Sequence, residues 1–470
     1  MWLSHIATLS LLIATARSGS STTVSVPTRQ GVVIGLIEDD TPSVRQFLSI
    51  PFAVPPIGNL RFAPPKPIKE VGFIKATKMG PSCMQVVGTA SPPELGIEGG
   101  NPNPKLSEDC LTLSIWTPNG KNRGSKLPVI VFVHGGAFIA GGQNVPYDIP
   151  AQWVERTKHH IVVAINYRLG FFGFPTSAAL GEHNLGLLDQ RLAIEWVRDS
   201  IAEFGGDPSR ILLWGQSAGA ISIGYYQYAF VDDPIVSGFA MDSGSELTLG
   251  GKEADNHDDF TTVTQKLDCG GRSAAAELAC VRKRPSEVII NAVKNSGLVF
   301  FSPIADEKLV FADYNKQAAA GRISKLPAII GSNADENSVF AICPSFRTSM
   351  QVAPRPNRLK AGAPTFRYQF HGNFTNLSHN GTMGAYHGSE LPLLMGTHSL
   401  YRGNSTELEW ATSAAMQDAW VAFARGGVDG LAKKAGWPLY DNVESGKLMF
   451  FGKDVPKSIG NSRDVELQCN

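Results

Sequence analysis

The chain has 470 residues, of which 43% are hydrophobic and 18% are charged, which is ordinary for a globular protein with a large core. Lysine plus arginine and aspartate plus glutamate number 42 each, so the formal net charge is +0. This balance gives no basic excess that would favour nucleic acid or an anionic membrane as a partner. Length alone allows either two or three domains or one large α/β domain.

The first residues are typical of a targeting segment. Residues 6–16 are apolar and end in Ala14-Thr15-Ala16, a small-x-small cleavage pattern. We therefore expect a signal peptide over residues 1–16, rather than a membrane span or a buried N-terminal helix, and a mature chain over residues 17–470. No other stretch reaches the roughly 18 apolar residues of a transmembrane helix, so we expect no stable membrane insertion.

The remaining chain alternates short apolar runs with segments of helical period. The predicted strands span residues 30–37, 44–50, 111–116, 128–134, 161–167, 211–214, 327–331 and 364–370. The predicted helices span residues 187–204, 220–228 and 407–425. This alternation predicts an α/β fold with a mostly parallel sheet that helices cover on both faces.

A run of small residues, Gly135, Gly136 and Ala137, follows the predicted strand at residues 128–134. Attack on an ester carbonyl builds negative charge on the carbonyl oxygen, and backbone N–H groups reach it only where side chains leave room. We expect Gly136 and Ala137 to donate to that oxyanion, together with Ala218 from the next motif. The alternative is a glycine-rich loop that simply ends a strand.

The sequence Gly215-Gln216-Ser217-Ala218-Gly219 lies between a predicted strand and a predicted helix. In that context G-x-S-x-G is typical of a nucleophile elbow, a tight turn that pushes the serine hydroxyl outward. The residues two positions from the serine are small because strand and helix pack closely around the turn. Ser217 is therefore the predicted nucleophile.

A serine hydroxyl needs a base, and the base needs an acid that orients it. In this fold class the order along the chain is serine, then aspartate or glutamate, then histidine. The loop after residues 327–331 offers Asp335 and Glu336, between which spacing alone does not decide. The favoured base is His387, in a loop after residues 364–370, over four other downstream histidines, His257, His371, His379 and His398.

The chain has six cysteines, at positions 83, 110, 269, 280, 343 and 469. An even number in an exported chain favours three disulfides. Their order suggests Cys83 with Cys110 and Cys269 with Cys280, which leaves Cys343 and Cys469, but spacing does not establish the pairing. None of the cysteines has the spacing of a zinc site, and we expect neither a metal nor a cofactor.

Four N-x-[ST] sequons also agree with secretion. They occur at Asn373, Asn376, Asn380 and Asn404. Each is a predicted N-glycosylation site, and the close spacing of the first three predicts an exposed loop.

At these motifs the chain resembles the type-B carboxylesterase/lipase family, the cholinesterase-like α/β-hydrolases, and in particular fungal-type secreted esterases. Residues 204–219 match the serine signature of the family and residues 108–115 its second signature. Shorter motifs at residues 51–65, 184–190 and 437–440 extend the match over nearly the whole chain.

The resemblance implies one α/β-hydrolase domain that hydrolyses carboxylic esters without a cofactor. It implies Ser217 as nucleophile, His387 as general base and Glu336, rather than Asp335, as the acid. It also implies the disulfides Cys83–Cys110 and Cys269–Cys280.

Two features depart from the family. Asn337 stands where the family usually has a glycine after the acid. The connection from Glu336 to His387 is shorter than usual, with the shortfall around residues 346–363. This shortfall predicts a more open gorge, or else it marks a segment lost from the gene model.

The sequence also limits the substrate. Cholinesterases hold choline esters against a tryptophan in the first disulfide loop, but residues 84–109 contain no tryptophan, tyrosine or phenylalanine. Cholinesterases also have glutamate before the serine, where this chain has Gln216. Acetylcholine is therefore not an expected substrate.

In related fungal lipases the same loop forms a lid, which needs an exposed apolar face. Its apolar residues here are scattered among proline, glycine and polar residues, at Val86, Val87, Leu95 and Ile97. We therefore expect a secreted hydrolase of small or medium soluble esters. The alternatives are a lipase on long-chain acylglycerols, an acyltransferase, or a catalytically silent binding protein on the same fold.

Overall fold

The computed structural model describes residues 21–87, 104–248, 252–253, 257–298, 300–338, 356–378, 383–400, 403–442 and 446–466. The predicted signal peptide, Cys343, Cys469 and the sequon at Asn380 lie outside these residues. The apolar positions Leu95 and Ile97 of the first disulfide loop lie outside them as well.

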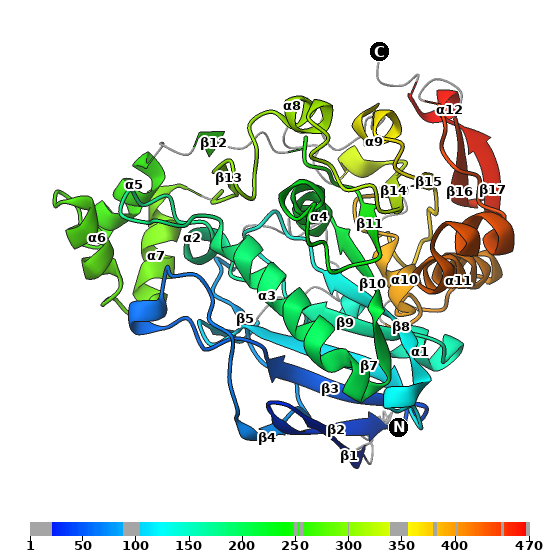
Figure 1. Cartoon of the computed structure of the whole chain (residues 1–470), viewed down its shortest axis with the longest axis horizontal. Helices are drawn as coiled ribbons and strands as arrows, with labels where there is room; N and C mark the ends of the chain where they lie inside the picture. The colour runs from blue at the N-terminus through cyan, green and yellow to red at the C-terminus, as the bar shows by residue number, and fades with distance from the viewer. Residues whose placement is uncertain are drawn as a thin grey trace, which may run out of the picture.

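Among the described residues, 13 strands form one sheet in the order β1-β2-β3-β7-β9-β8-β10-β11-β14-β15-β16-β17, with β4 paired to β2 (Figure 1). Adjacent strands of this sheet run parallel from β9 through β16. Adjacent strands from β1 to β9, by way of β2, β3 and β7, pair antiparallel, and so do β16 and β17. The strands are β1 (Ser21–Thr28), β2 (Gly31–Glu38), β3 (Val44–Pro51), β4 (Gly72–Lys75), β7 (Thr112–Pro118), β8 (Leu127–Val133), β9 (Ile161–Ile165), β10 (Gly206–Gln216), β11 (Gly238–Asp242), β14 (Ala328–Asn333), β15 (Thr365–Phe370), β16 (Lys447–Lys453) and β17 (Val455–Asn461). Two short sheets pair β5 (Ser82–Cys83) with β6 (Leu106–Ser107) and β12 (Lys252–Glu253) with β13 (Ile304–Ala305).

The central strands are buried on both faces, which explains their continuous apolar sequences. Successive residues of β8 face opposite sides of the sheet: Val129 and Val131 pack in one core layer, and Ile130 and Phe132 in the other. The first layer contains α3 and α4, and the second contains α1, α10 and α11. The expected α/β fold, with helices on both faces of a mostly parallel sheet, is confirmed.

Each predicted helix overlaps an observed one, and each predicted strand overlaps an observed strand. The long α11 begins with a capping box, in which Thr406 and Glu409 satisfy each other's backbone N–H groups. The helices are α1 (Ala151–Thr157), α2 (Gly170–Gly173), α3 (Leu185–Ser200), α4 (Ala218–Ala229), α5 (Asp258–Lys266), α6 (Ala274–Val281), α7 (Ser286–Ser296), α8 (Tyr314–Ala319), α9 (Pro356–Lys360), α10 (Leu391–Met395), α11 (Glu407–Asp429) and α12 (Arg463–Glu466).

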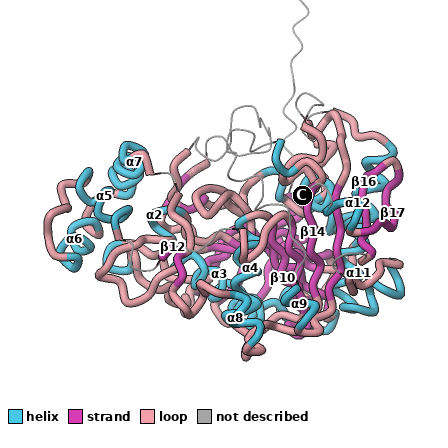
Figure 2. Tube along the Cα trace, turned by 90° about the horizontal axis from the view of Figure 1, so that it is seen from above, coloured by secondary structure: helices cyan, strands magenta, loops and turns pink. Residues whose placement is uncertain are grey.

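Helices α5, α6 and α7 form a group at one end of the molecule, away from β16 and β17, as both views show (Figures 1 and 2). The disulfide Cys269–Cys280 ties the loop after α5 to α6. Within the described segments, no helix has the length and apolar character that a membrane crossing requires.

Candidate active site

Ser217 lies in a strained turn between β10, which ends at Gln216, and α4, which begins at Ala218. Its backbone has φ 55° and ψ −121°, a conformation that costs energy for a residue with a side chain and that recurs at functional sites. The turn is fastened to the next strand, because the Ser217 N–H donates to the Asp242 carbonyl at 2.8 Å. Ser217 is thus held at the carboxyl edge of the parallel sheet.

The two glycines of the motif are required by close backbone packing. A Cβ on Gly215 would lie 2.5 Å from the carbonyl carbon of Gly219. A Cβ on Gly219 would lie 2.0 Å from the Val133 oxygen, at the end of β8. Both distances are too short for real atoms, so the strand and helix meet here only with glycine at both positions.

The loop after β8 lies against this turn. A Cβ on Gly135 would lie 3.0 Å from Ser217 Cβ. Gly136 and Ala137 have positive φ angles of 102° and 55°, and for Ala137 this is a conformation that residues with a side chain rarely adopt and that recurs at functional sites. In the described part of the chain, no hydrogen bond uses the N–H of Gly136, Ala137 or Ala218.

His387 and Glu336 are brought together from two loops. The imidazole Nδ1 lies 2.5 Å from Glu336 Oε2, and only 2% of Glu336 is exposed. The other carboxylate oxygen, Oε1, accepts from the Asn333 N–H at 2.8 Å at the end of β14. The carboxylate is therefore fixed by the strand and aimed at the ring.

Asp335, the neighbouring candidate, contacts the backbone of the histidine loop instead. Its Oδ2 accepts from the Ala385 N–H at 2.8 Å, and its own N–H donates to the Ala385 carbonyl at 3.0 Å. It also lies so close to Gly384 that a Cβ there would be 2.1 Å from Oδ2. Asp335 positions the loop, whereas Glu336 contacts the imidazole.

On its other side, His387 contacts the residue before the serine. His387 Nε2 lies 3.2 Å from Nε2 of Gln216, a residue that is only 5% exposed. No hydrogen bond within the described segments joins the Ser217 hydroxyl to His387. The imidazole is thus located beside the elbow, and its second nitrogen contacts an amide.

Two more carboxyl groups lie behind Glu336, and sequence reasoning missed both as parts of the site. Asp242, at the end of β11, accepts from Trp214 Nε1 at 2.5 Å, and burial raises its pKa to about 7. Burial also raises the pKa of Glu390 well above its ordinary value, chiefly by desolvation and then by repulsion from Asp242. The Asn333 side chain donates to Glu390.

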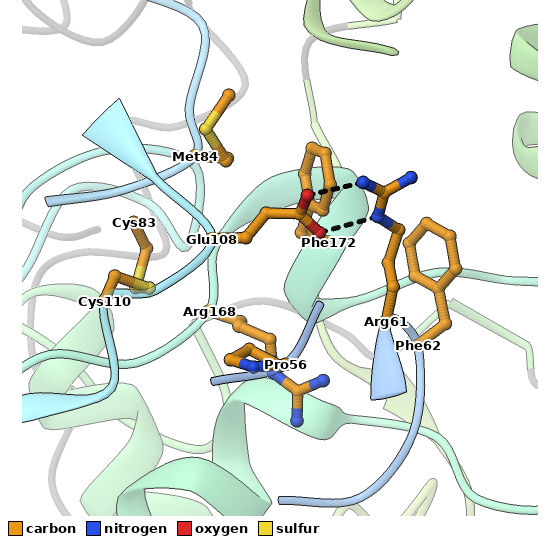
Figure 3. Close-up of a pocket in the computed structure, with 9 residues that line it drawn as sticks. All are labelled: Pro56, Arg61, Phe62, Cys83, Met84, Glu108, Cys110, Arg168 and Phe172. Atoms are coloured by element: carbon orange, nitrogen blue, oxygen red, sulfur yellow. Dashed lines mark hydrogen bonds and ion pairs between the residues drawn. A yellow bond between two sulfur atoms is a disulfide. The ribbon is translucent and has the colours of Figure 1, made fainter. Parts of the chain in front are cut away.

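The first disulfide loop is anchored by a buried ion pair next to the Cys83–Cys110 disulfide (Figure 3). Arg61 Nε donates to Glu108 Oε1 at 2.6 Å, and Arg61 Nη1 donates to three carbonyls at and after the end of α6, of Val281, Arg282 and Arg284. Removing one partner of such a pair typically costs about 3–5 kcal/mol. The adjoining cavity of about 10 Å³ has room for no more than one water molecule, so this cluster holds the loop and binds no ester.

The two disulfides implied by the resemblance, Cys83–Cys110 and Cys269–Cys280, are both formed. Among the described residues, no group of three or more histidine, cysteine, aspartate or glutamate side chains is arranged to hold a metal ion.

An elbow serine at the carboxyl edge of a parallel sheet, with loop N–H groups beside it, defines an α/β-hydrolase. The family model described as "Carboxylesterase family" matches residues 22–351 and 337–467, so the chain belongs to the carboxylesterase family. The two matched stretches overlap at residues 337–351, inside the connection from Glu336 to His387, which by its sequence is shorter than usual for the family.

Similar curated proteins agree with this membership. The chain is 38% identical to chlorogenic acid esterase from Aspergillus niger, with 98% of this chain and 96% of that protein covered. It is 36% identical to secreted lipase 5 from Gibberella zeae (96% and 94% covered) and 29% identical to carboxylesterase 1C from Rattus norvegicus (94% and 93% covered). The protein is a carboxylic-ester hydrolase.

Proposed function

We propose that the protein hydrolyses small or medium soluble esters through an acyl-enzyme on Ser217. His387 takes the serine proton as the hydroxyl attacks the ester carbonyl, and Glu336 orients the ring and stabilises the imidazolium. The N–H groups of Gly136, Ala137 and Ala218 hold the oxyanion. The alcohol leaves with the proton from His387, and water then releases the acid by the same route.

One observation carries this proposal. The imidazole of His387 lies 2.5 Å from Glu336 on one side and 3.2 Å from the side chain of Gln216, the residue before the serine, on the other. Three separate chain segments thus bring a carboxylate, an imidazole and the serine turn next to one another. The unused N–H groups beside the serine support the assignment of the oxyanion donors.

The substrate class rests on the first disulfide loop and on the relatives. That loop carries no aromatic residue between its cysteines that would hold a quaternary ammonium group. The relative at 38% identity is named for chlorogenic acid, which makes this compound a natural member of a test panel. Another relative is named as a secreted lipase, so long-chain acylglycerols are the competing substrate class.

A panel of p-nitrophenyl esters from acetate to palmitate, with chlorogenic acid alongside, tests the substrate class. We expect the highest kcat/KM on dissolved acetate and butyrate, without a jump in rate when longer esters form micelles. A rate that appears only above micelle formation would instead assign a lipase.

Two further measurements separate the remaining alternatives. A folded protein that hydrolyses no ester and resists an organophosphonate serine probe would be a binding protein. Product analysis with competing alcohols would reveal an acyltransferase, because ester products would then replace the free acid.

We also propose that the protein is exported, with cleavage after Ala16 leaving residues 17–470 as one domain. The two disulfides and the relatives named as secreted lipases support export. N-terminal sequencing of the secreted protein tests the cleavage site.

The sequons differ in accessibility, which predicts unequal glycosylation. Asn373 and Asn404 are exposed, whereas Asn376 is 8% exposed and its Nδ2 donates to the His398 carbonyl, to Ser405 Oγ and to Glu409 Oε1. A glycan bonded to that nitrogen would disrupt this buried network. Peptide mapping of protein secreted by a eukaryotic host should therefore find glycans at Asn373 and Asn404 and an unmodified Asn376. A glycan on Asn376 in folded, active protein would contradict this assignment.

A further inference from the structure

The side chain of Gln216 fills the space between the two loops that complete the site. Its Nε2 lies 3.2 Å from His387 Nε2, and a Cβ on Gly388 would lie 3.6 Å from the same nitrogen. On the other side, a Cβ on Gly135 would lie 2.6 Å from Gln216 Oε1. The amide is therefore enclosed between the loop after β8 and the histidine loop, next to Ser217.

The partners of the imidazole define what this contact can be. Because Nδ1 lies against the Glu336 carboxylate, which only accepts hydrogen bonds, the proton of a neutral ring is on Nδ1. The other nitrogen, Nε2, then carries a lone pair in the ring plane and accepts. The Gln216 amide nitrogen only donates, so the contact is an N–H···N bond to the neutral base.

The serine must use the same lone pair. Attack on an ester begins when the Ser217 hydroxyl gives its proton to Nε2, which has room for one strong donor. The Gln216 bond therefore keeps the neutral ring aimed at the elbow before attack and weakens as the serine proton arrives. A carboxylate at this position would instead attract the protonated ring.

We propose that Gln216 is a positioning residue that orients the neutral imidazole of His387 and, by being uncharged, lets the base work at lower pH than a glutamate would. This inference rests on the proposed function, in which His387 is the general base.

Other titratable groups belong to the elements that build the site. Glu336 contacts the ring from the loop after β14, the neighbouring Asp335 binds the backbone at Ala385, and Glu390 is on the histidine loop itself. Asp242 lies at the end of β11, and His134, whose pKa burial lowers to about 4, lies at the end of β8. Of the groups behind and beside the ring, Asp242 has a pKa of about 7, so it is the one whose titration must be separated from that of the base.

The test is the dependence of kcat/KM on pH for Gln216→Glu and Gln216→Met with p-nitrophenyl butyrate. The new carboxylate in Gln216→Glu favours the imidazolium. The acidic limb of the plot of kcat/KM against pH, where activity rises as the base loses its proton, therefore moves up by about one pH unit. Gln216→Met removes the donor without adding charge, so the acidic limb moves up by clearly less than in Gln216→Glu, while kcat falls by about fivefold at an unchanged KM. Gln317→Glu, on the half-buried face of α8, adds the same charge elsewhere and leaves the limb in place.

Three outcomes would overturn the inference. If the acidic limb does not move in Gln216→Glu and both variants are only less stable to heat, Gln216 has a structural role. Equal movement in Gln216→Met removes charge as the cause. A limb that moves in Asp242→Asn as far as in Gln216→Glu assigns the titration to Asp242.

Failure of the proposed function would look different. Active-site titration with an organophosphonate, mapped by peptide analysis, counts the reactive Ser217 in each variant. If wild type is not labelled at Ser217, the catalytic assignment itself fails, whereas a labelled series with unmoved limbs rejects only the role of Gln216.

Discussion

Replacement of Ser217 by alanine is expected to lower kcat by roughly 10⁶-fold, because the hydroxyl is the atom that forms the acyl-enzyme and no other group replaces it. The N–H groups of Gly136, Ala137 and Ala218 remain, so the variant should still hydrolyse the ester somewhat faster than water alone does. KM should change little, since the alanine removes only one oxygen from the site. Initial rates on p-nitrophenyl acetate and butyrate, with circular dichroism as a check of folding, give the result.

A matched control exists one turn further along α4. Ser222 donates its hydroxyl proton to the Ala218 carbonyl at 2.9 Å and accepts from Gln190 at 3.1 Å. Its hydroxyl is therefore on the same helix as the elbow but is used in hydrogen bonds within the protein. Ser222→Ala should lose about 1 kcal/mol of stability and keep kcat near the wild-type value. A folded Ser217→Ala protein that retains most of its activity would end the acyl-enzyme mechanism.

The strands that carry the site could be predicted where burial on both faces leaves a continuous apolar sequence, as in β8, β9 and β10. β11 was missed, because its five residues begin with Gly238 and end with Asp242 and show no period. It is nevertheless the strand to which the Ser217 N–H is bonded. The exposed face of the edge strand β17, with Val455 and Ile459, carries too weak a pattern to predict.

Within the site, the turn around Ser217 is predictable because G-x-S-x-G encodes its own geometry in five consecutive residues. The choice between Asp335 and Glu336 is not, since adjacent residues of a tight turn point in different directions and spacing is the same for both. The contact of Gln216 depends on His387, 171 positions away, so only the folded chain reveals it. Burial likewise separates Asn376 from Asn373 and Asn404, which share its sequon motif.

Exchange of Glu336 for glutamine is expected to lower kcat by about 10⁴-fold. The carboxylate now accepts from His387 Nδ1 at 2.5 Å, which fixes the tautomer whose Nε2 is free to accept the serine proton. A glutamine amide turned toward Nδ1 donates instead, which holds the ring proton on Nε2 and removes the base. It also lacks the charge that stabilises the imidazolium during attack. The value of kcat on p-nitrophenyl butyrate measures both losses together.

The neighbouring exchange, Asp335→Asn, is the matched comparison because it makes the same chemical change one residue away. Its remaining oxygen still accepts from the Ala385 N–H, so the histidine loop should keep its place, with a loss of about 1 kcal/mol in urea unfolding and little change in kcat. The ratio of the two kcat values then identifies the acid without reference to either residue's absolute contribution. If Asp335→Asn proves the more damaging, the orienting carboxylate is Asp335, and the turn rearranges when an ester binds.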